Sequence, residues 1–228
     1  MKLKKSYLAM APAILLGAQA AMAQGPQLEE VIVTATKRAT SEMDTPLSME
    51  VFTGDTIKQD NILNIEEMSQ RMPSVIITGN IQTTSVNIRG MGSLENRAFE
   101  QSVAMFIDEV YLPRSKSYRA PFFDLERAEV LRGPQAVLFG VNATAGTVNI
   151  HSATTRPGDE AFVDVTAAYE TEYSRYRGDV VAGMTIGESL GARVALRYTD
   201  QDDGWFDNKV TGEEENTFEE TLARLTLA

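Results

Sequence analysis

The sequence contains no cysteine and only one histidine, His151, among its 228 residues. The lack of cysteine excludes a disulfide framework, a thiol nucleophile and a Cys/His zinc cluster. One alternative is a secreted hydrolase, which would need a carboxylate pair or a histidine-based catalytic site. No residue next to His151 could form such a site. We therefore expect a protein that is not an enzyme and that has no cofactor and no metal site.

Basic residues are also scarce, because 21 Lys and Arg stand against 32 Asp and Glu, for a net charge of -11. A protein this acidic repels a phosphate backbone, so no nucleic-acid partner is expected.

Long apolar runs are missing beyond the N-terminus. Residues 7–20 are apolar and Ala-rich, follow three lysines, and precede the small-x-small sequence Ala21-Met22-Ala23. This run contains Pro12 and is shorter than the roughly 20 residues that span a bilayer as a helix. The pattern predicts a signal peptide at residues 1–23, cleaved after Ala23.

Residues 44–155 show short helix and strand patterns separated by Gly- and Pro-marked turns. A helix is expected after Thr53, and a second one, with Asn64 as its N-cap and Pro73 after its end, at residues 65–72. Pro134 and Gly140 bracket a third short helix at 135–139. Strand patterns occupy residues 75–78, 85–89, 103–111 and 147–152.

Four motifs occur in order within this region: VNIRGMG at residues 86–92, FIDEVY at 106–111, EVLRGPQAVLFG at 129–140 and AGTVNI at 145–150. Their order and spacing resemble the plug domain of TonB-dependent outer-membrane receptors. The resemblance implies a receptor that takes up a scarce ligand and a location in the outer membrane. Receptors for siderophores, cobalamin, sugars and aromatic compounds share these motifs, and among these ligands we expect a ferric siderophore, because of the loop cations described below.

A short β-branched segment lies between the signal peptide and the plug region. Taken alone it is typical of an ordinary first strand, but after a signal peptide it resembles the Ton box of the same family. The resemblance implies that the inner-membrane partner TonB pairs with this segment by strand addition. The residues of the segment are Glu30, Val31, Ile32, Val33, Thr34 and Ala35.

Two arginines stand inside otherwise packable motifs, Arg89 and Arg132. Taken alone, each would form a surface salt bridge, worth about 0 to 1 kcal/mol. The resemblance implies instead that both face glutamates on the inner wall of the barrel, beyond this chain, and help to hold the plug.

Two long polar loops, residues 91–101 and 112–123, follow these strands, and binding residues often lie on such loops. They form either a solvated charged surface or, as the resemblance implies, plug apices that contact the ligand. Their cations form a local positive patch suited to an anionic ligand such as a ferric siderophore. The candidate ligand-binding residues are Asn96, Arg97, Arg114, Lys116, Tyr118 and Arg119.

After residue 156 the pattern changes to strands of about ten residues that alternate apolar and polar side chains, which is typical of an outer-membrane barrel wall in contact with lipid. At most four such strands are present, whereas a plugged transporter barrel has about 22. The fold class expected is therefore an α+β plug domain followed by the first antiparallel strands of a transmembrane β-barrel that is incomplete in this chain. The expected divisions are 1–23, 24–43 (Ton box and linker), 44–155 (plug) and 156–228 (barrel strands).

Two alternatives remain open from the sequence. One is a secreted, soluble, β-rich interaction domain, and the other is a truncated receptor fragment without a function of its own.

Overall fold

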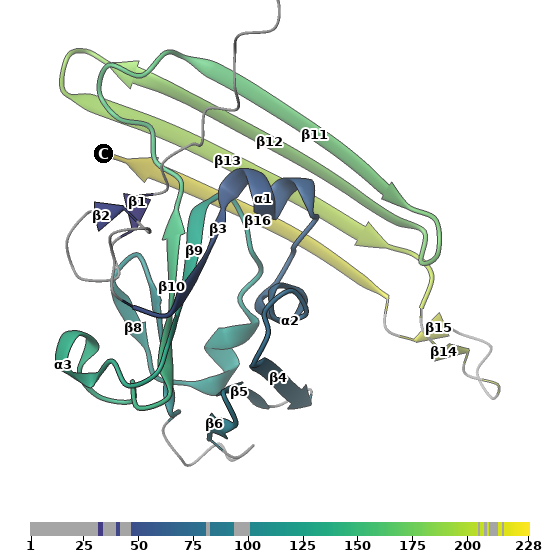
Figure 1. Ribbon diagram of the computed structural model, residues 1–228. Helices are drawn as coiled ribbons and strands as arrows, with labels where there is room; N and C mark the ends of the chain where they lie inside the picture. The colour runs from purple at the N-terminus through teal and green to yellow at the C-terminus, as the bar shows by residue number, and fades with distance from the viewer. Residues whose placement is uncertain are drawn as a thin grey trace, which may run out of the picture.

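A computed structural model describes residues 32–33, 40–41, 47–80, 83–93, 101–204, 206–207, 209, 214–215 and 217–228. The signal-peptide prediction for residues 1–23 lies outside these ranges. The described chain forms a plug and, after residue 161, a sheet of long strands that lies across one side of the plug (Figure 1). We call this second sheet the wall sheet. None of the helices in the described ranges has the length and apolar character of a membrane span.

The plug is built around a five-stranded sheet in the order β3-β9-β10-β7-β8. Strand β10 runs parallel to β7 and antiparallel to β9, and β9 runs antiparallel to β3. A second sheet joins β4, β5 and β6. The strands are β3 (Met49–Thr53), β4 (Val75–Asn80), β5 (Thr83–Ile88), β6 (Met91–Gly92), β7 (Val103–Ile107), β8 (Val110–Leu112), β9 (Leu125–Arg132) and β10 (Gly146–Ser152).

Two of the short helices begin at the caps that the sequence predicts. The Thr53 side chain accepts a hydrogen bond from Thr56 N at the start of α1 (Gly54–Gln59). At the start of α2 (Ile65–Ser69), Asn64 Oδ1 accepts from Glu67 N at 2.9 Å and Glu67 Oε2 accepts from Leu63 N at 2.6 Å. The Asn64 half of a capping box is therefore present, whereas the Glu67 carboxylate reaches the N–H of Leu63, one residue before the N-cap, instead of the N–H of Asn64. The other helices are η2 (Ser115–Arg119), a 3-10 helix, and α3 (Ala136–Phe139).

Three local predictions differ from the structure. Residues 103–111 do not form one strand, because Asp108 and Glu109 adopt positive φ (47° and 66°) and turn the chain between β7 and β8. The helix expected at 65–72 ends at Ser69. The strands β3 and β9 lie outside the ranges assigned to strands from the sequence, because Glu126, Arg127 and Glu129 hide the periodicity of β9.

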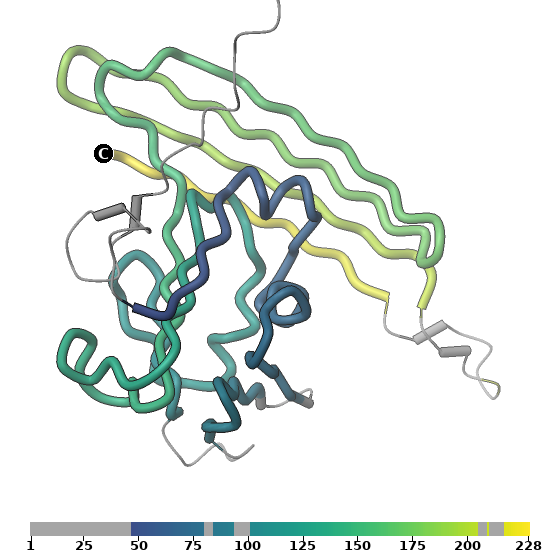
Figure 2. Tube along the Cα trace, in the orientation of Figure 1, coloured from purple at the N-terminus to yellow at the C-terminus, as the bar shows by residue number. Residues whose placement is uncertain are grey.

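The wall sheet has the order β11-β12-β13-β16, with every neighbouring pair antiparallel. The chain turns between β12 and β13 at Gly187, whose φ is +66°. The expected long, alternating strands are confirmed, and the trace in Figure 2 shows that they extend well past the plug. The strands are β11 (Phe162–Glu170), β12 (Arg175–Ile186), β13 (Leu190–Gln201) and β16 (Phe218–Leu227).

Alternation along the wall strands places apolar side chains on the face away from the plug and polar ones toward it. On β13, Val194 and Leu196 are exposed, whereas the side chains of Arg193 and Arg197 are only 11% and 13% exposed.

The plug has its own core, in which Ile65, Met68 and Ile88 are fully buried. Two pairs of two-residue strands complete the assignment: β1 (Ile32–Val33) pairs with β2 (Thr40–Ser41), and β14 (Phe206–Asp207) pairs with β15 (Glu214–Glu215). The short strand β6 pairs with the end of β5.

Candidate functional site: the contact between plug and wall sheet

The residues expected from the sequence to contact the ligand do not form one group. Arg114, Lys116 and Arg119 are exposed on and next to η2, as a positive patch requires. Tyr118 is different: it is 0% exposed, packs in the plug core and donates from its hydroxyl to Val103 O at 2.5 Å. Burial raises its pKa well above the ordinary value of 10.0. The interpretation of Tyr118 as a ligand contact is therefore wrong, and Asn96 and Arg97 lie outside the described residues.

Arg119 lines a cleft of about 450 Å³ between the plug and the wall sheet. Arg175 and Arg177 of β12 line the same cleft, as do Glu66 and Glu220. The positive patch on η2 is thus continuous with a space bounded by charged side chains from both parts of the chain.

The two arginines assigned to plug retention have partners inside the plug. Arg89 is exposed, and its Nη2 donates to Ser48 Oγ at 2.9 Å. Arg132 on β9 forms a hydrogen-bonded ion pair with Glu50 on the neighbouring strand β3. Their predicted contacts with glutamates beyond this chain stay predictions.

Within the described residues, much of the contact between the plug and the wall sheet comes from an arginine cluster that the sequence did not reveal. Arg193 and Arg197 are four residues apart on β13, and Arg224 on β16 pairs in register with Ala195 between them. All three guanidinium groups reach the segment of the plug between η2 and β9, residues 122–124, which we call the docking segment.

The tightest of these contacts is an ion pair. Nε and Nη2 of Arg193 donate to both carboxylate oxygens of Asp124, at 2.8 and 2.6 Å. The Asp124 side chain is only 2% exposed and that of Arg193 11%. Bidentate pairs of this kind are stronger and more directional than single hydrogen bonds. Because Asp124 is buried, this pair fixes the position of the docking segment along β13.

The other two arginines hold the backbone and one ring of the docking segment. Arg197 Nη1 donates to Phe122 O at 2.7 Å, and Arg224 Nη1 donates to Phe123 O at 2.8 Å and to Asp124 O at 3.1 Å. The same two guanidinium groups lie over the Phe123 ring, 5.3 and 5.4 Å from its centroid. At these distances a guanidinium group is attracted to the face of an aromatic ring, so both arginines help to hold the Phe123 ring in place. Phe123 itself packs on Val181 and Ala195 of the wall sheet.

The linker from β10 to β11 lies against the same wall strands. A Cβ at Gly191 would lie 1.8 Å from Thr155 O, and one at Gly183 would lie 2.4 Å from Thr155 Oγ1. Two glycines on the wall thus let the linker approach the sheet closely. Thr185 adds hydrogen bonds to the linker, accepting from Gly158 N at 3.1 Å and donating to Asp159 O at 3.0 Å.

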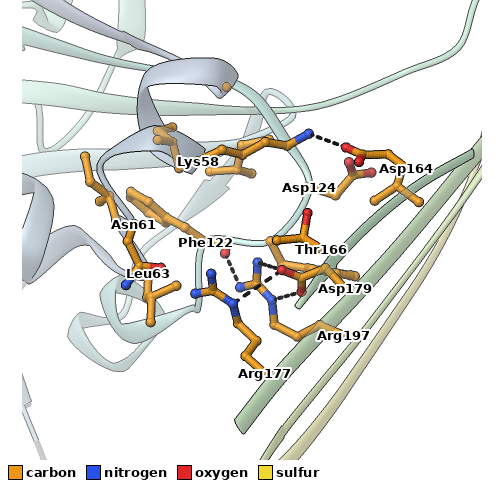
Figure 3. A pocket seen from close by; sticks show the side chains of 16 residues that line it. Lys58, Asn61, Leu63, Phe122, Asp124, Asp164, Thr166, Arg177, Asp179 and Arg197 are labelled. Carbon is orange, nitrogen blue, oxygen red and sulfur yellow. Dashed lines mark hydrogen bonds and ion pairs between the residues drawn. The ribbon is translucent and has the colours of Figure 1, made fainter. Parts of the chain in front are cut away.

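A small cavity of about 80 Å³ lies beside the docking segment, between α1 and the wall sheet (Figure 3). Asp179 projects into it from β12 and accepts from Arg197 at 2.5 Å, while Arg177 lies 3.4 Å from the same carboxylate. At the far edge of the cavity, Lys58 of α1 pairs with Asp164 of β11 at 3.1 Å (Figure 3). The Lys58 and Asp164 side chains are 53% and 46% exposed, so this pair is a weak surface contact.

Comparison with known proteins agrees with the architecture. Residues 41–147 match the model of the TonB-dependent receptor plug domain. The chain belongs to the TonB-dependent receptor family. The resemblance seen in the sequence and the expected fold class are confirmed.

Named relatives extend the match beyond the plug. The vitamin B12 transporter BtuB of Photobacterium profundum is 30% identical over 94% of this chain and 35% of its own length. An iron-regulated outer membrane virulence protein of Vibrio cholerae is 28% identical over 54% of this chain and 20% of its own length. The chain therefore spans about a third or less of the length of these relatives. They are transport and outer-membrane proteins, not enzymes, in agreement with the expectation from the sequence.

A solved structure shows the same fold. The ferric yersiniabactin uptake receptor FyuA of Yersinia pestis superposes with a TM-score of 0.67 at 22% identity, over 79% of this chain and 28% of its own. Since this coverage of the present chain exceeds the share that the plug match occupies, the likeness includes part of the wall sheet as well as the plug.

Proposed function

We propose that this chain is part of a TonB-dependent receptor that takes up a ferric siderophore across the outer membrane. The family is established by the plug match, whereas the ligand is inferred. The observation that supports an anionic iron chelate is the exposed positive patch of Arg114, Lys116 and Arg119, which lies next to the cleft between plug and wall sheet. The relative from Vibrio cholerae, named for its iron regulation, favours the same ligand class.

Vitamin B12 is the competing ligand, because one relative is named as its transporter. Cyanocobalamin carries no net charge, so its binding does not require several cations grouped at η2. The positive patch is therefore the feature that favours the siderophore, and the two ligands can be compared directly in one uptake assay.

The proposal includes export to the outer membrane through a signal peptide at residues 1–23, a plug at 44–155 and pairing of TonB with the segment from Glu30 to Ala35. In the structure, Ile32 and Val33 of this segment pair with Ser41 and Thr40 as a short antiparallel ladder. Extended backbone at these two residues is suited to strand addition. With about five backbone hydrogen bonds at roughly 1 kcal/mol net each, less the cost of ordering, such a complex is weak and reversible.

The test is uptake by cells that express the protein from its own gene, with a deletion of TonB as reference. The probes are radiolabelled iron bound to siderophores extracted from iron-starved medium of the source cells, and radiolabelled cyanocobalamin. We expect TonB-dependent uptake of the iron probe. Val33→Pro removes a ladder donor and should abolish uptake while ligand binding persists; Val33→Ile, which keeps the donor, is the matched control.

The ligand patch is tested separately by binding. Arg114→Ala with Arg119→Ala should weaken binding of the iron probe at least several-fold, because two of the three cations of the patch are removed. Arg71→Ala serves as the control, since Arg71 is also an exposed cation and pairs with Asp60 elsewhere on the plug. Unchanged binding after the double substitution, or uptake of cyanocobalamin alone, would refute the siderophore proposal.

A further inference from the structure

The contacts between plug and wall sheet are unevenly distributed. The docking segment has a buried ion pair, three hydrogen bonds from guanidinium groups to backbone carbonyls, and a ring enclosed between two arginines and the sheet. These contacts come from β13 and β16 and reach one segment of three residues, 122–124. The pair between Lys58 and Asp164, which joins α1 to β11, is half exposed and therefore weak.

The covalent connection between the two parts leaves the plug at the same place. Ala153 N donates to Asp124 O at 2.9 Å, so the start of the linker is hydrogen-bonded to the docking segment itself. From there Thr155 passes over Gly183 and Gly191, and its side chain is 2% exposed. Lifting the docking segment from the wall would therefore require the ion pair, the carbonyl contacts and the linker packing to be lost together.

The opposite side of the plug is built differently. Strand β8 and helix α3 lie away from the wall sheet (Figure 1). The apolar side chains there have little cover in the described structure: Val110 of β8 is 63% exposed, Val137 of α3 is 99% exposed, and Val141, just after α3, is 68% exposed. Apolar side chains in contact with a surface by dispersion alone separate without breaking any ion pair or hydrogen bond.

We propose that the arginine cluster and the docking segment stay in contact during transport, and that the ligand passes on another side of the plug. In this inference Arg193, Arg197 and Arg224 are positioning residues, because they keep the C-terminal half of the plug registered on the wall while the ligand passes. The inference rests on the proposed function. Its test must therefore separate a failure of transport in general from an opening at the arginine cluster.

A cysteine pair tests whether the linker that starts at the docking segment must leave the wall sheet, and residues 1–228 contain no other cysteine. In Thr155→Cys with Gly183→Cys, the new Cβ at 183 lies 2.4 Å from the position of Thr155 Oγ1, so the two side chains are adjacent and a small shift brings them to the Cβ separation of about 3.5–4.5 Å that a disulfide needs. The Phe162 ring must rotate to make room, and at 38% exposure it has space to do so. We expect equal rates of iron-probe uptake with the pair oxidised and reduced, whereas loss on oxidation and recovery with reductant would overturn the inference.

A second measurement does not depend on forming that disulfide. Ala195 is 1% exposed beneath the Phe123 ring, so the thiol of Ala195→Cys can react with a maleimide only if the docking segment lifts. Labelling of this thiol should be equally slow in energised cells taking up the iron probe and in cells treated with a protonophore. Val137→Cys, on the fully exposed tip of α3, is the positive control for reagent access.

The outcomes are distinct. A several-fold rise in labelling of Ala195→Cys that requires both the iron probe and energised cells, with uptake intact, would overturn the inference alone. Lack of TonB-dependent uptake of every probe by the unaltered protein would overturn the proposed function, and with it the inference. Slow labelling together with normal uptake by the oxidised cysteine pair supports both.

Discussion

Removing the carboxylate charge of Asp124 should weaken the plug far more than removing that of Asp164, although both groups form an ion pair between plug and wall sheet. Asp124→Asn leaves the Arg193 guanidinium, 11% exposed, without its anionic partner. An uncompensated buried charge costs about 3 kcal/mol or more. Asp164→Asn removes the partner of a half-exposed lysine, which costs at most about 1 kcal/mol.

The assay is urea unfolding of the purified protein in detergent, with brief trypsin digestion at each urea concentration to measure the intact plug. With an m-value of about 1–3 kcal/mol per molar urea, a loss of about 3 kcal/mol lowers the midpoint by about 1–3 M. Asp164→Asn should lower it by a small fraction of that. Arg193→Lys, which keeps the charge but not the bidentate geometry, should fall between the two.

Equal midpoints for Asp124→Asn and Asp164→Asn would refute the reasoning, because they would show that burial of the Arg193–Asp124 pair has no energetic consequence. A smaller m-value in one variant would instead indicate loss of two-state unfolding, and the midpoints would then be compared only among variants with equal slopes.

Three further outcomes follow from the structure and use the same urea assay. Tyr118→Phe should lower plug stability by about 1–3 kcal/mol, since Val103 O loses its buried donor, and should leave binding of the iron probe unchanged. Gly191→Ala should cost about 1–3 kcal/mol because its Cβ would meet Thr155 O at 1.8 Å, whereas Gly178→Ala, with nothing within 4 Å, should change stability by less than about 0.5 kcal/mol. Burial, and then the charge of Arg127, lowers the pKa of His151 below its ordinary value of 6.5 in the folded plug. As the pH falls, His151 therefore takes up its proton in the unfolded chain before it does so in the folded plug. The free energy of unfolding should decrease as the pH drops below 6.5, by at most about 1.4 kcal/mol per pH unit. The dependence of stability on pH should become weaker in His151→Gln, and an unchanged dependence would contradict its attribution to His151.

The wall sheet and the helix starts could be predicted from sequence because their signals are local. Two-residue alternation on β12 and β13 fixes which side chains face the plug, and the structure confirms it. The caps at Thr53 and Asn64 depend on neighbours within three residues. The end of α2 at Ser69 depends on how the chain packs beyond it, so the helix predicted from the sequence, which ends at residue 72, is too long.

The buried position of Tyr118 could not be predicted in the same way. It stands among three cations in a loop-like segment, and only the tertiary fold brings its hydroxyl to Val103 O, 15 residues earlier in the chain. The partner of Arg193 is likewise 69 residues away in sequence. One available signal was the alternation of β13 itself, which places Arg193 and Arg197 on the face that an α+β domain must cover; a buried arginine needs an acidic or carbonyl partner on that domain.

The arginine cluster also supplies hydrogen-bond donors to backbone carbonyl groups of the plug. The docking segment connects η2 to β9 in irregular conformation, with Asp124 at φ +49°, so its carbonyl groups cannot all be satisfied by a regular ladder. Arg197 and Arg224 donate to the carbonyls of Phe122, Phe123 and Asp124, and these same carbonyls give the inward-facing guanidinium groups the acceptors that they need away from water. Each side of the contact thus satisfies polar groups that the other would otherwise bury without a partner. Because neither the guanidinium groups nor the carbonyl groups are stable when buried without the other, formation of the wall sheet and docking of the plug on it should be coupled. Removal of one arginine should therefore expose the docking segment to protease before it disturbs the core around Met68.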